Sequence, residues 1–160
     1  MLTFLDLDAW KESRVLYKTV YRAVEKLPST ENYGLSSQLR RASISISANI
    51  AEGQGRGTRK DYIHFLYNDR GSAYEVESHL IACADLNLLD RDTLTRLYKQ
   101  TVKVIRLVNS LIRSLKKASI SVTKEMTSTY GVSCDYVTNE DIENWEKCID
   151  TNPYIANSKP

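Results

Sequence analysis

The sequence predicts an all-α protein: an antiparallel up-down-up-down four-helix bundle with a C-terminal extension that carries one short helix. Three observations support this prediction. Apolar side chains recur every three or four residues through four long segments, glycine and proline fall mostly between those segments, and no segment has a convincing strand pattern. Because the predicted connections are short, consecutive helices should lie antiparallel to one another.

The first two helices are expected at residues 8–27 and 35–53. The apolar period of the first segment ends at Pro28, which cannot continue a helix. Within the second segment, residues 43–47 alternate between serine and isoleucine as a strand would. Their flanks keep the helical period without a break, so we predict a helix there as well.

The third and fourth helices are expected to begin at N-cap residues. Thr58 is followed by Asp61 three residues later, which approximates a capping box, and the helical period then continues to about Leu86. Asp90 is the expected N-cap of the last helix, residues 91–117.

Beyond the four helices the character of the sequence changes. Residues 1–118 are expected to form the bundle, and residues 119–160 an acidic C-terminal extension. The extension is rich in Ser, Thr and Tyr and carries no long apolar period. Near its end Ile142, Trp145 and Ile149 share one face of an expected short helix.

The composition is that of a soluble globular domain. The chain has 160 residues and a mass of 18.3 kDa, with 42% hydrophobic and 26% charged residues, close to the average for folded proteins. No apolar run is long enough to span a membrane, and the N-terminus lacks the basic and apolar regions of a signal peptide. We therefore expect a cytoplasmic protein that does not associate with membranes.

We expect no metal, cofactor or catalytic site. His64 and His79 lie about four turns apart on one predicted helix, so they cannot share a metal ion from one face. The three cysteines are scattered and form no Cys-x-x-Cys motif, so we expect free thiols. An enzyme hypothesis would use Glu52, His64 or Asp69, and it requires these side chains to meet in the folded chain.

Charge is distributed unevenly along the chain. Residues 1–118 hold 19 Lys/Arg and 13 Asp/Glu, whereas residues 119–160 hold 3 and 7. The fourth helix alone carries eight basic residues and one acidic residue. At about 100° per residue, six of the basic residues fall within an arc of about 100° opposite the apolar face. They are Arg96, Lys99, Lys103, Arg106, Arg113 and Lys117.

Such a row of cations is typical of a surface that binds the phosphates of a nucleic acid, because each neutralised phosphate releases a condensed counterion. The alternative is a solvated face balanced by acidic residues on neighbouring helices. A second basic cluster, Arg56, Arg59 and Lys60, surrounds a glycine turn that lacks the spacing of a P-loop. Backbone N–H groups of the glycine turn and of the start of the third helix could bind an anion there. The alternative is that the segment is only a tight turn between two helices.

Four polar residues of the second and third helices form a further candidate group. Asn49 and Glu52 lie three residues apart, and Arg70 and Ser72 lie within the third helix. A buried carboxylate needs a cationic or hydrogen-bonding partner. We therefore predict that these residues form a buried polar network that sets helix register and has no catalytic role.

Several segments together resemble a known bacterial family. They are residues 33–42 (YGLSSQLRRA), 47–53 (SANIAEG), 65–66 (FL) and 70–72 (RGS). They are similar to a four-helix-bundle family that includes proteins encoded in intervening sequences of large-subunit ribosomal RNA genes. The accessory variability determinant of diversity-generating retroelements is a relative of that family. The resemblance covers roughly residues 4–117.

The resemblance implies a basic, ring-like homopentamer without enzymatic activity or cofactor. In the retroelement branch such a ring binds nucleic acid and a reverse transcriptase, although this sequence is more similar to the intervening-sequence branch. RNA or an RNA/DNA hybrid is the expected ligand on this ground. The resemblance also singles out Gly71, an interior helix glycine that we expect to permit close approach of a neighbouring helix.

Two functional hypotheses fit these observations. The first is a non-enzymatic, oligomeric nucleic-acid-binding accessory protein that assists a reverse transcriptase or another RNA process. The alternative is a protein-interaction scaffold whose bundle surface or tail docks a partner protein without nucleic acid. Affinity that decreases steeply with salt would favour the first, and loss of partner capture on deleting the helix around Trp145 would favour the second.

Overall fold

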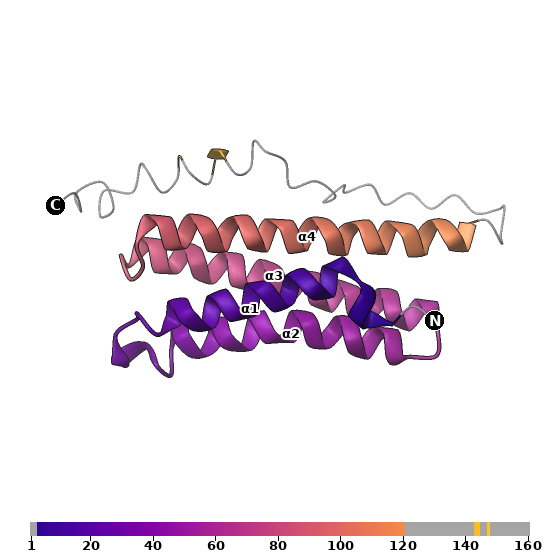
Figure 1. Ribbon diagram of the computed structural model, residues 1–160, viewed down its shortest axis with the longest axis horizontal. Coiled ribbons are helices and arrows are strands. Elements are labelled where there is room, and N and C mark those ends of the chain that lie inside the picture. The colour runs from indigo at the N-terminus through magenta and orange to yellow at the C-terminus, as the bar shows by residue number, and fades with distance from the viewer. Residues whose placement is uncertain (1–2, 121–142, 145–146, 148–160) are drawn as a thin grey trace.

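The computed structural model describes residues 3–120, 143–144 and 147. Within residues 3–120 it contains no strand, and four long helices form a bundle in which each runs opposite to the one before (Figure 1). The predicted antiparallel four-helix bundle is confirmed. The elements are η1 (Phe4–Asp6), α1 (Asp8–Val24), η2 (Ser29–Glu31), α2 (Leu35–Gly55), α3 (Arg59–Asp85) and α4 (Arg91–Ile120).

The short helix expected near residues 138–149 lies largely outside the described residues, and Trp145 is among those not described. The three described positions there, Glu143, Asn144 and Lys147, are helical.

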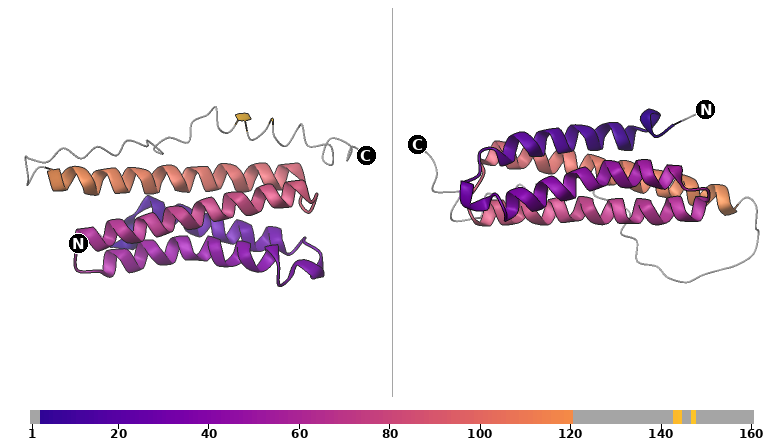
Figure 2. Two further views of the ribbon diagram at one scale, coloured as in Figure 1. Left: turned by 180° about the vertical axis from the view of Figure 1, so that it is seen from behind. Right: turned by 90° about the horizontal axis from the view of Figure 1, so that it is seen from below.

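The long helices are arranged in a closed cycle. Helix α1 packs against α2 and α4, and α3 packs against the same two helices, as the views from behind and from below show (Figure 2). One end of the bundle therefore holds the α1–α2 and α3–α4 connections, and the other holds the α2–α3 turn and the end of α4 (Figure 1).

The core lies along the axis of the bundle and is built from the apolar faces of all four helices. Burying one such aliphatic side chain contributes about 1.5–3 kcal/mol. The largest side chains with less than 2% exposure are Leu16 and Val20 of α1, Leu39, Ile46 and Ile50 of α2, Leu66, Val76 and Leu80 of α3, and Leu94, Leu97 and Ile105 of α4.

The predicted N-caps are confirmed. The Thr58 hydroxyl accepts a hydrogen bond from the Asp61 backbone N–H at 3.1 Å, which satisfies a free donor of the first turn of α3. Oδ1 of Asp90 accepts from the Thr93 backbone N–H at 2.7 Å at the start of α4. Between these helices Asn87 takes a left-handed conformation with φ of 53°, which asparagine tolerates better than most residues and which ends α3 sharply.

Helices α2 and α3 approach each other closely at Gly53. A Cβ atom at this position would lie 2.6 Å from Cβ of Phe65 and 2.8 Å from Cδ2 of Tyr62, so only glycine fits without a shift. Helix α2 continues through the buried Gly53 to Gly55, two residues beyond the predicted end.

Gly71 has no such neighbour. A Cβ added there would meet no atom within 4 Å among the described residues, and the position is exposed on α3. The prediction that Gly71 permits close helix approach is therefore wrong within a single chain.

Candidate nucleic-acid interface

The outer face of α4 carries the predicted basic row. The helix buries its apolar side, including Val104, Val108 and Ile112, and the 3.6-residue period then turns the basic residues toward solvent. Arg96, Lys99, Lys103, Arg106 and Lys117 are exposed, and Arg113 is half-buried. We call these six residues the α4 basic face.

Lys103 of this face is paired with a carboxylate. Nζ of Lys103 lies 2.8 Å from Oε1 of Glu12 on α1, and Nε2 of Gln100 donates to Oε2 of Glu12 at 2.8 Å. The hydrogen bonds from Lys103 and Gln100 hold the pKa of the Glu12 carboxyl below its usual range. The alternative of a balanced surface is therefore realised at Lys103, where α1 supplies the acid.

The second basic cluster lies at the end of the bundle where α4 ends (Figure 1). Arg56, Arg59 and Lys60 are exposed around the α2–α3 turn. The Arg56 guanidinium is paired with the Glu52 carboxylate one turn earlier and lies 4.9 Å from the centre of the Phe65 ring. Arg56 is therefore held in place on the helix surface.

The four residues of the predicted polar network fall into separate groups. Nδ2 of Asn49 donates to Oγ of Ser45 at 3.3 Å, and the Ser45 and Ser72 hydroxyls lie 2.8 Å apart, which links α2 to α3. Arg70 instead points toward α4, where its Nη1 donates to Oδ1 of Asn109 at 3.2 Å.

Glu52 belongs to neither group, because its side chain is 51% exposed and paired with Arg56. The α2–α3 contact thus contains hydroxyl and amide groups, and the carboxylate that was predicted to belong to the network lies outside it.

A different carboxyl is buried in the core. Asp69 of α3 has no exposed surface, and neither of its oxygens has a hydrogen-bond partner within the described part of the chain. Burial raises the pKa of this carboxyl well above its usual range, because the charged form is poorly solvated there. The Tyr62 hydroxyl is also buried without a partner, and burial, with a contribution from Asp69, raises its pKa to about 12.

The enzyme hypothesis required Glu52, His64 and Asp69 to meet, and the structure separates Asp69 from the other two. Asp69 is enclosed in the core, whereas Glu52 and His64 are exposed. Within the described residues no group of three or more His, Cys, Asp or Glu side chains is placed to hold a metal ion. No helix found there is long and apolar enough to cross a membrane.

Two further basic residues, which could not be singled out from the sequence, lie next to the α4 basic face. Arg22 and Lys26, from α1 and the residues just after it, line one cavity together with Arg96. The spacing of Thr19, Arg22, Ala23 and Lys26 places them on one side of a helix. That spacing does not reveal which helix lies opposite, so the contribution of α4 became visible only in the folded chain.

The sequence matches the model of the 23S rRNA-intervening sequence protein over residues 5–110. The chain belongs to this family. The region matched by the 23S rRNA-intervening sequence protein model takes in α1, α2, α3 and most of α4. Arg113, Lys117 and the C-terminal extension lie beyond it.

A solved structure shares the fold. It is described as a protein of unknown function from the S23 ribosomal protein family of Bacteroides thetaiotaomicron. Its TM-score is 0.62 at 22% sequence identity, and the match covers 66% of this chain and 98% of that chain. No curated protein matches the chain. The comparisons thus establish the family and the bundle.

Proposed function

We propose that the protein is a non-enzymatic, homo-oligomeric accessory protein that binds RNA or an RNA/DNA hybrid through the α4 basic face. The observation that carries this proposal is the row of basic residues from Arg96 to Lys117 along the outer side of one straight helix. A row of this kind attracts a phosphate backbone with little sequence preference. Membership of a family named for an RNA context favours RNA as the ligand.

The ion pair at Lys103 is compatible with this role. The Lys103 side chain is 55% exposed and the Glu12 side chain 24%. Exposed pairs contribute at most about 1 kcal/mol and are screened by salt. A phosphate can therefore compete with Glu12 for the ammonium group.

The test is fluorescence anisotropy with a single-stranded RNA at several salt concentrations. If the face contacts at least three phosphates, log K should decrease with log salt with a slope of about −2 or steeper. The triple reversal K99E/K103E/R106E should weaken binding at least about tenfold. The matched control K11E/R14E/R41E changes the net charge equally on α1 and α2, at residues that do not line the α1–α2 cavity, and should have a smaller effect. Undetectable binding at low salt, or equal losses in both variants, would contradict the proposal.

Two exposed apolar patches support self-association. One is a cavity of about 550 Å³ at α1 and α2, where Tyr17, Tyr21 and Ile44 are among the lining residues. The other contains Tyr74 and Ile81, seven residues apart on α3 and each 39% exposed. Because the patches differ, a contact that joined one patch to the other would be head-to-tail, and such a contact forms a ring when the rotation between neighbouring copies closes. We propose that the homo-oligomer, a pentamer in the family expectation, assembles in this way.

Light scattering after size exclusion tests the assembly. Ile44→Glu and Ile81→Glu should each lower the oligomeric mass, because each removes one half of the same contact. Leu86→Glu is the control, since Leu86 is 60% exposed at the end of α3 and belongs to neither patch. A monomeric wild-type protein, or oligomers unaffected by both substitutions, would contradict this model.

We assign partner docking to the acidic extension, residues 119–160, on the basis of its charge. A reverse transcriptase is the partner expected from the family resemblance. Deleting residues 121–160 should then abolish capture of the reverse transcriptase and leave RNA affinity unchanged. Capture that survives the deletion would refute this assignment.

A further inference from the structure

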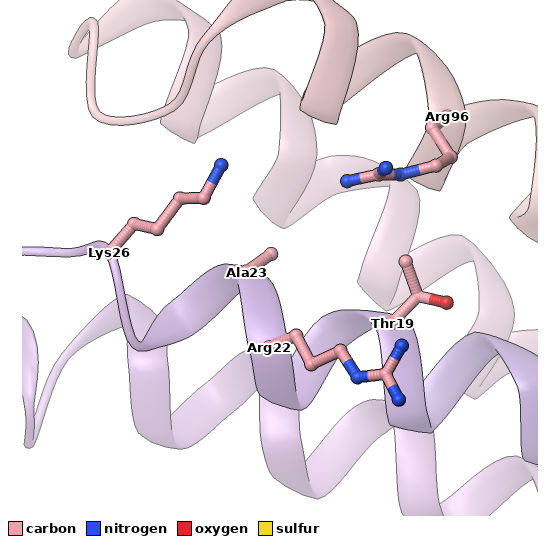
Figure 3. A pocket seen from close by; sticks show the side chains of 5 residues that line it. All are labelled: Thr19, Arg22, Ala23, Lys26 and Arg96. Carbon is pink, nitrogen blue, oxygen red and sulfur yellow. The ribbon is translucent and has the colours of Figure 1, made fainter.

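A cavity of about 190 Å³ lies where the C-terminal part of α1 meets the N-terminal part of α4. Its lining residues are Thr19, Arg22, Ala23 and Lys26 on one side and Arg96 on the other, so three of the five are cationic and none is acidic. Figure 3 shows the Arg96 guanidinium extending from α4 toward the side where Lys26 stands, while the Arg22 guanidinium lies along α1 near Thr19.

The positive charge of this cavity is only partly compensated. Nζ of Lys26 donates to Oδ2 of Asp90 at 3.2 Å and lies 3.3 Å from the Thr93 hydroxyl, so Asp90 balances one cation from outside the lining. Hydrogen bonds from Thr93 lower the pKa of Asp90 to about 2, which keeps this carboxylate charged at neutral pH. Arg22 and Arg96 form no ion pair with any described residue. Two guanidinium groups therefore share one small cavity.

We propose that this cavity is a binding site for a single phosphate group. A guanidinium group presents several N–H donors in a fixed plane that matches phosphate oxygens. A tetrahedral phosphate can accept from three directions at once, which fits donors that come from two helices, whereas a planar carboxylate is satisfied by one guanidinium. The Thr19 hydroxyl already donates to the Val15 carbonyl at 2.8 Å, so the donors for phosphate are the three basic side chains.

The inference rests on the proposed function for the source of the phosphate, since Arg96 is also the first residue of the α4 basic face. The site would hold either a backbone phosphate of bound RNA or its terminal phosphate. Its intrinsic chemistry does not depend on RNA: like charges brought together repel, and an anion between them removes that repulsion. Inorganic phosphate should therefore bind and should stabilise the folded chain.

The first experiment titrates the full-length protein with inorganic phosphate, followed by calorimetry and by thermal melting at constant ionic strength. We expect one saturable site per chain and a melting temperature that rises with phosphate. R22Q/R96Q should weaken phosphate binding at least about tenfold, because it removes charged hydrogen bonds. R14Q/K116Q removes the same charge from the same two helices outside the cavity, and it should leave phosphate binding unchanged.

Three results would overturn the site. The first is the absence of saturable phosphate binding, and the second is an equal loss of phosphate affinity in the two double variants. The third is acetate binding as tightly as phosphate, which would show that the cavity does not select a phosphate group. Circular dichroism of R22Q/R96Q checks that the variant is folded, and Arg96→Lys should retain part of the affinity because it keeps the charge.

The second experiment distinguishes the sources with two RNA oligonucleotides that differ only in a 5′-phosphate or a 5′-hydroxyl. If the terminal phosphate occupies the cavity, the 5′-phosphate increases affinity in the wild type and not in R22Q/R96Q. If a backbone phosphate occupies it, both RNAs bind equally, and R22Q/R96Q weakens both more than R14Q/K116Q does. RNA affinity reduced equally by both double variants would overturn the link to RNA. Phosphate binding without RNA binding would refute the proposed function and leave the site standing.

Discussion

Helices α1 and α4 differ from α2 and α3 in how they divide polar from apolar residues. The first pair separates a buried apolar face from a charged outer face sharply, whereas the second pair mixes small, polar and apolar side chains around the helix. The polar groups buried in the first pair are largely satisfied: the Ser13 hydroxyl donates to the Trp10 carbonyl and that of Thr101 to the Leu97 carbonyl. Of the six buried side-chain polar atoms without a partner among the described residues, five belong to α2 or α3.

The difference indicates two ways to stabilise a helix pair. Helices α1 and α4 rely on burial of a broad apolar face, which leaves the opposite face available for charge and ligand binding. Helices α2 and α3 make the most extensive contact in the bundle through residues such as Gly53, Ser45 and Ser72 that allow the backbones to approach. Small changes of volume should therefore matter most between α2 and α3, and changes of charge should affect binding more than stability on α4.

The largest effect is expected from Gly53→Ala. The added methyl group would meet the Phe65 Cβ atom, which cannot move without the backbone. Overpacking of this kind costs about 1–3 kcal/mol, and alanine gains roughly 1 kcal/mol over glycine in a helix, so the free energy of unfolding should fall by up to about 2 kcal/mol. Urea denaturation should show the loss of stability.

Gly71→Ala is the matched control for this prediction. No described atom lies within 4 Å of a methyl group placed there. The substitution should therefore raise the free energy of unfolding by up to about 1 kcal/mol, the helix preference of alanine over glycine. The two glycines should thus respond with opposite signs. A loss at Gly71 that appears only in the oligomer would place this residue in a contact between copies.

Asp69→Asn should change how stability depends on pH. Because burial raises the pKa of Asp69 in the folded state, the folded chain holds this proton more strongly than the unfolded chain, in which the pKa is about 3.9. Wild-type stability should therefore decrease as the pH rises above about 4 and through the folded-state pKa. Between pH 5 and pH 8 we expect the free energy of unfolding of Asp69→Asn to increase relative to that of the wild type by at least about 1 kcal/mol, since each pKa unit corresponds to about 1.4 kcal/mol. If the stability of the wild type and of Asp69→Asn depended on pH in the same way, the conclusion that the Asp69 carboxyl is buried without a partner would be contradicted.

The smallest effect is expected from Glu12→Gln. Because the pKa of Glu12 is lowered in the folded state, its ion pair contributes above the ordinary carboxyl pKa and is lost as the pH falls. The substitution should cost less than about 1 kcal/mol at neutral pH. It also releases Lys103 for a phosphate. The slope of log K for RNA binding against log salt should therefore become more negative by about 0.7. Asp8→Asn, on the same helix, is the control and should leave that slope unchanged.

Much of the fold could be predicted from the sequence. The spacing of apolar residues located all four helices, and the N-caps at Thr58 and Asp90 were identified from residue type and position alone. The serine-isoleucine alternation at 43–47 was correctly interpreted as helical, and Ser43 and Ser47 bond to carbonyls of their own preceding turn. The exposure of five of the six α4 basic residues also agrees with the apolar period of that helix.

These successes have one physical basis. Helix periodicity and capping depend on residues within about one turn of one another, so the chain encodes them locally. The contacts between helices depend in addition on how each axis is rotated and shifted against its neighbour. Only the tertiary structure therefore decided that Gly53 is in close contact whereas Gly71 is open, that Asp69 is the buried carboxyl, and that Glu12 meets Lys103. For the same reason the meeting of Arg22, Lys26 and Arg96 around one cavity belongs to the packing of α1 on α4.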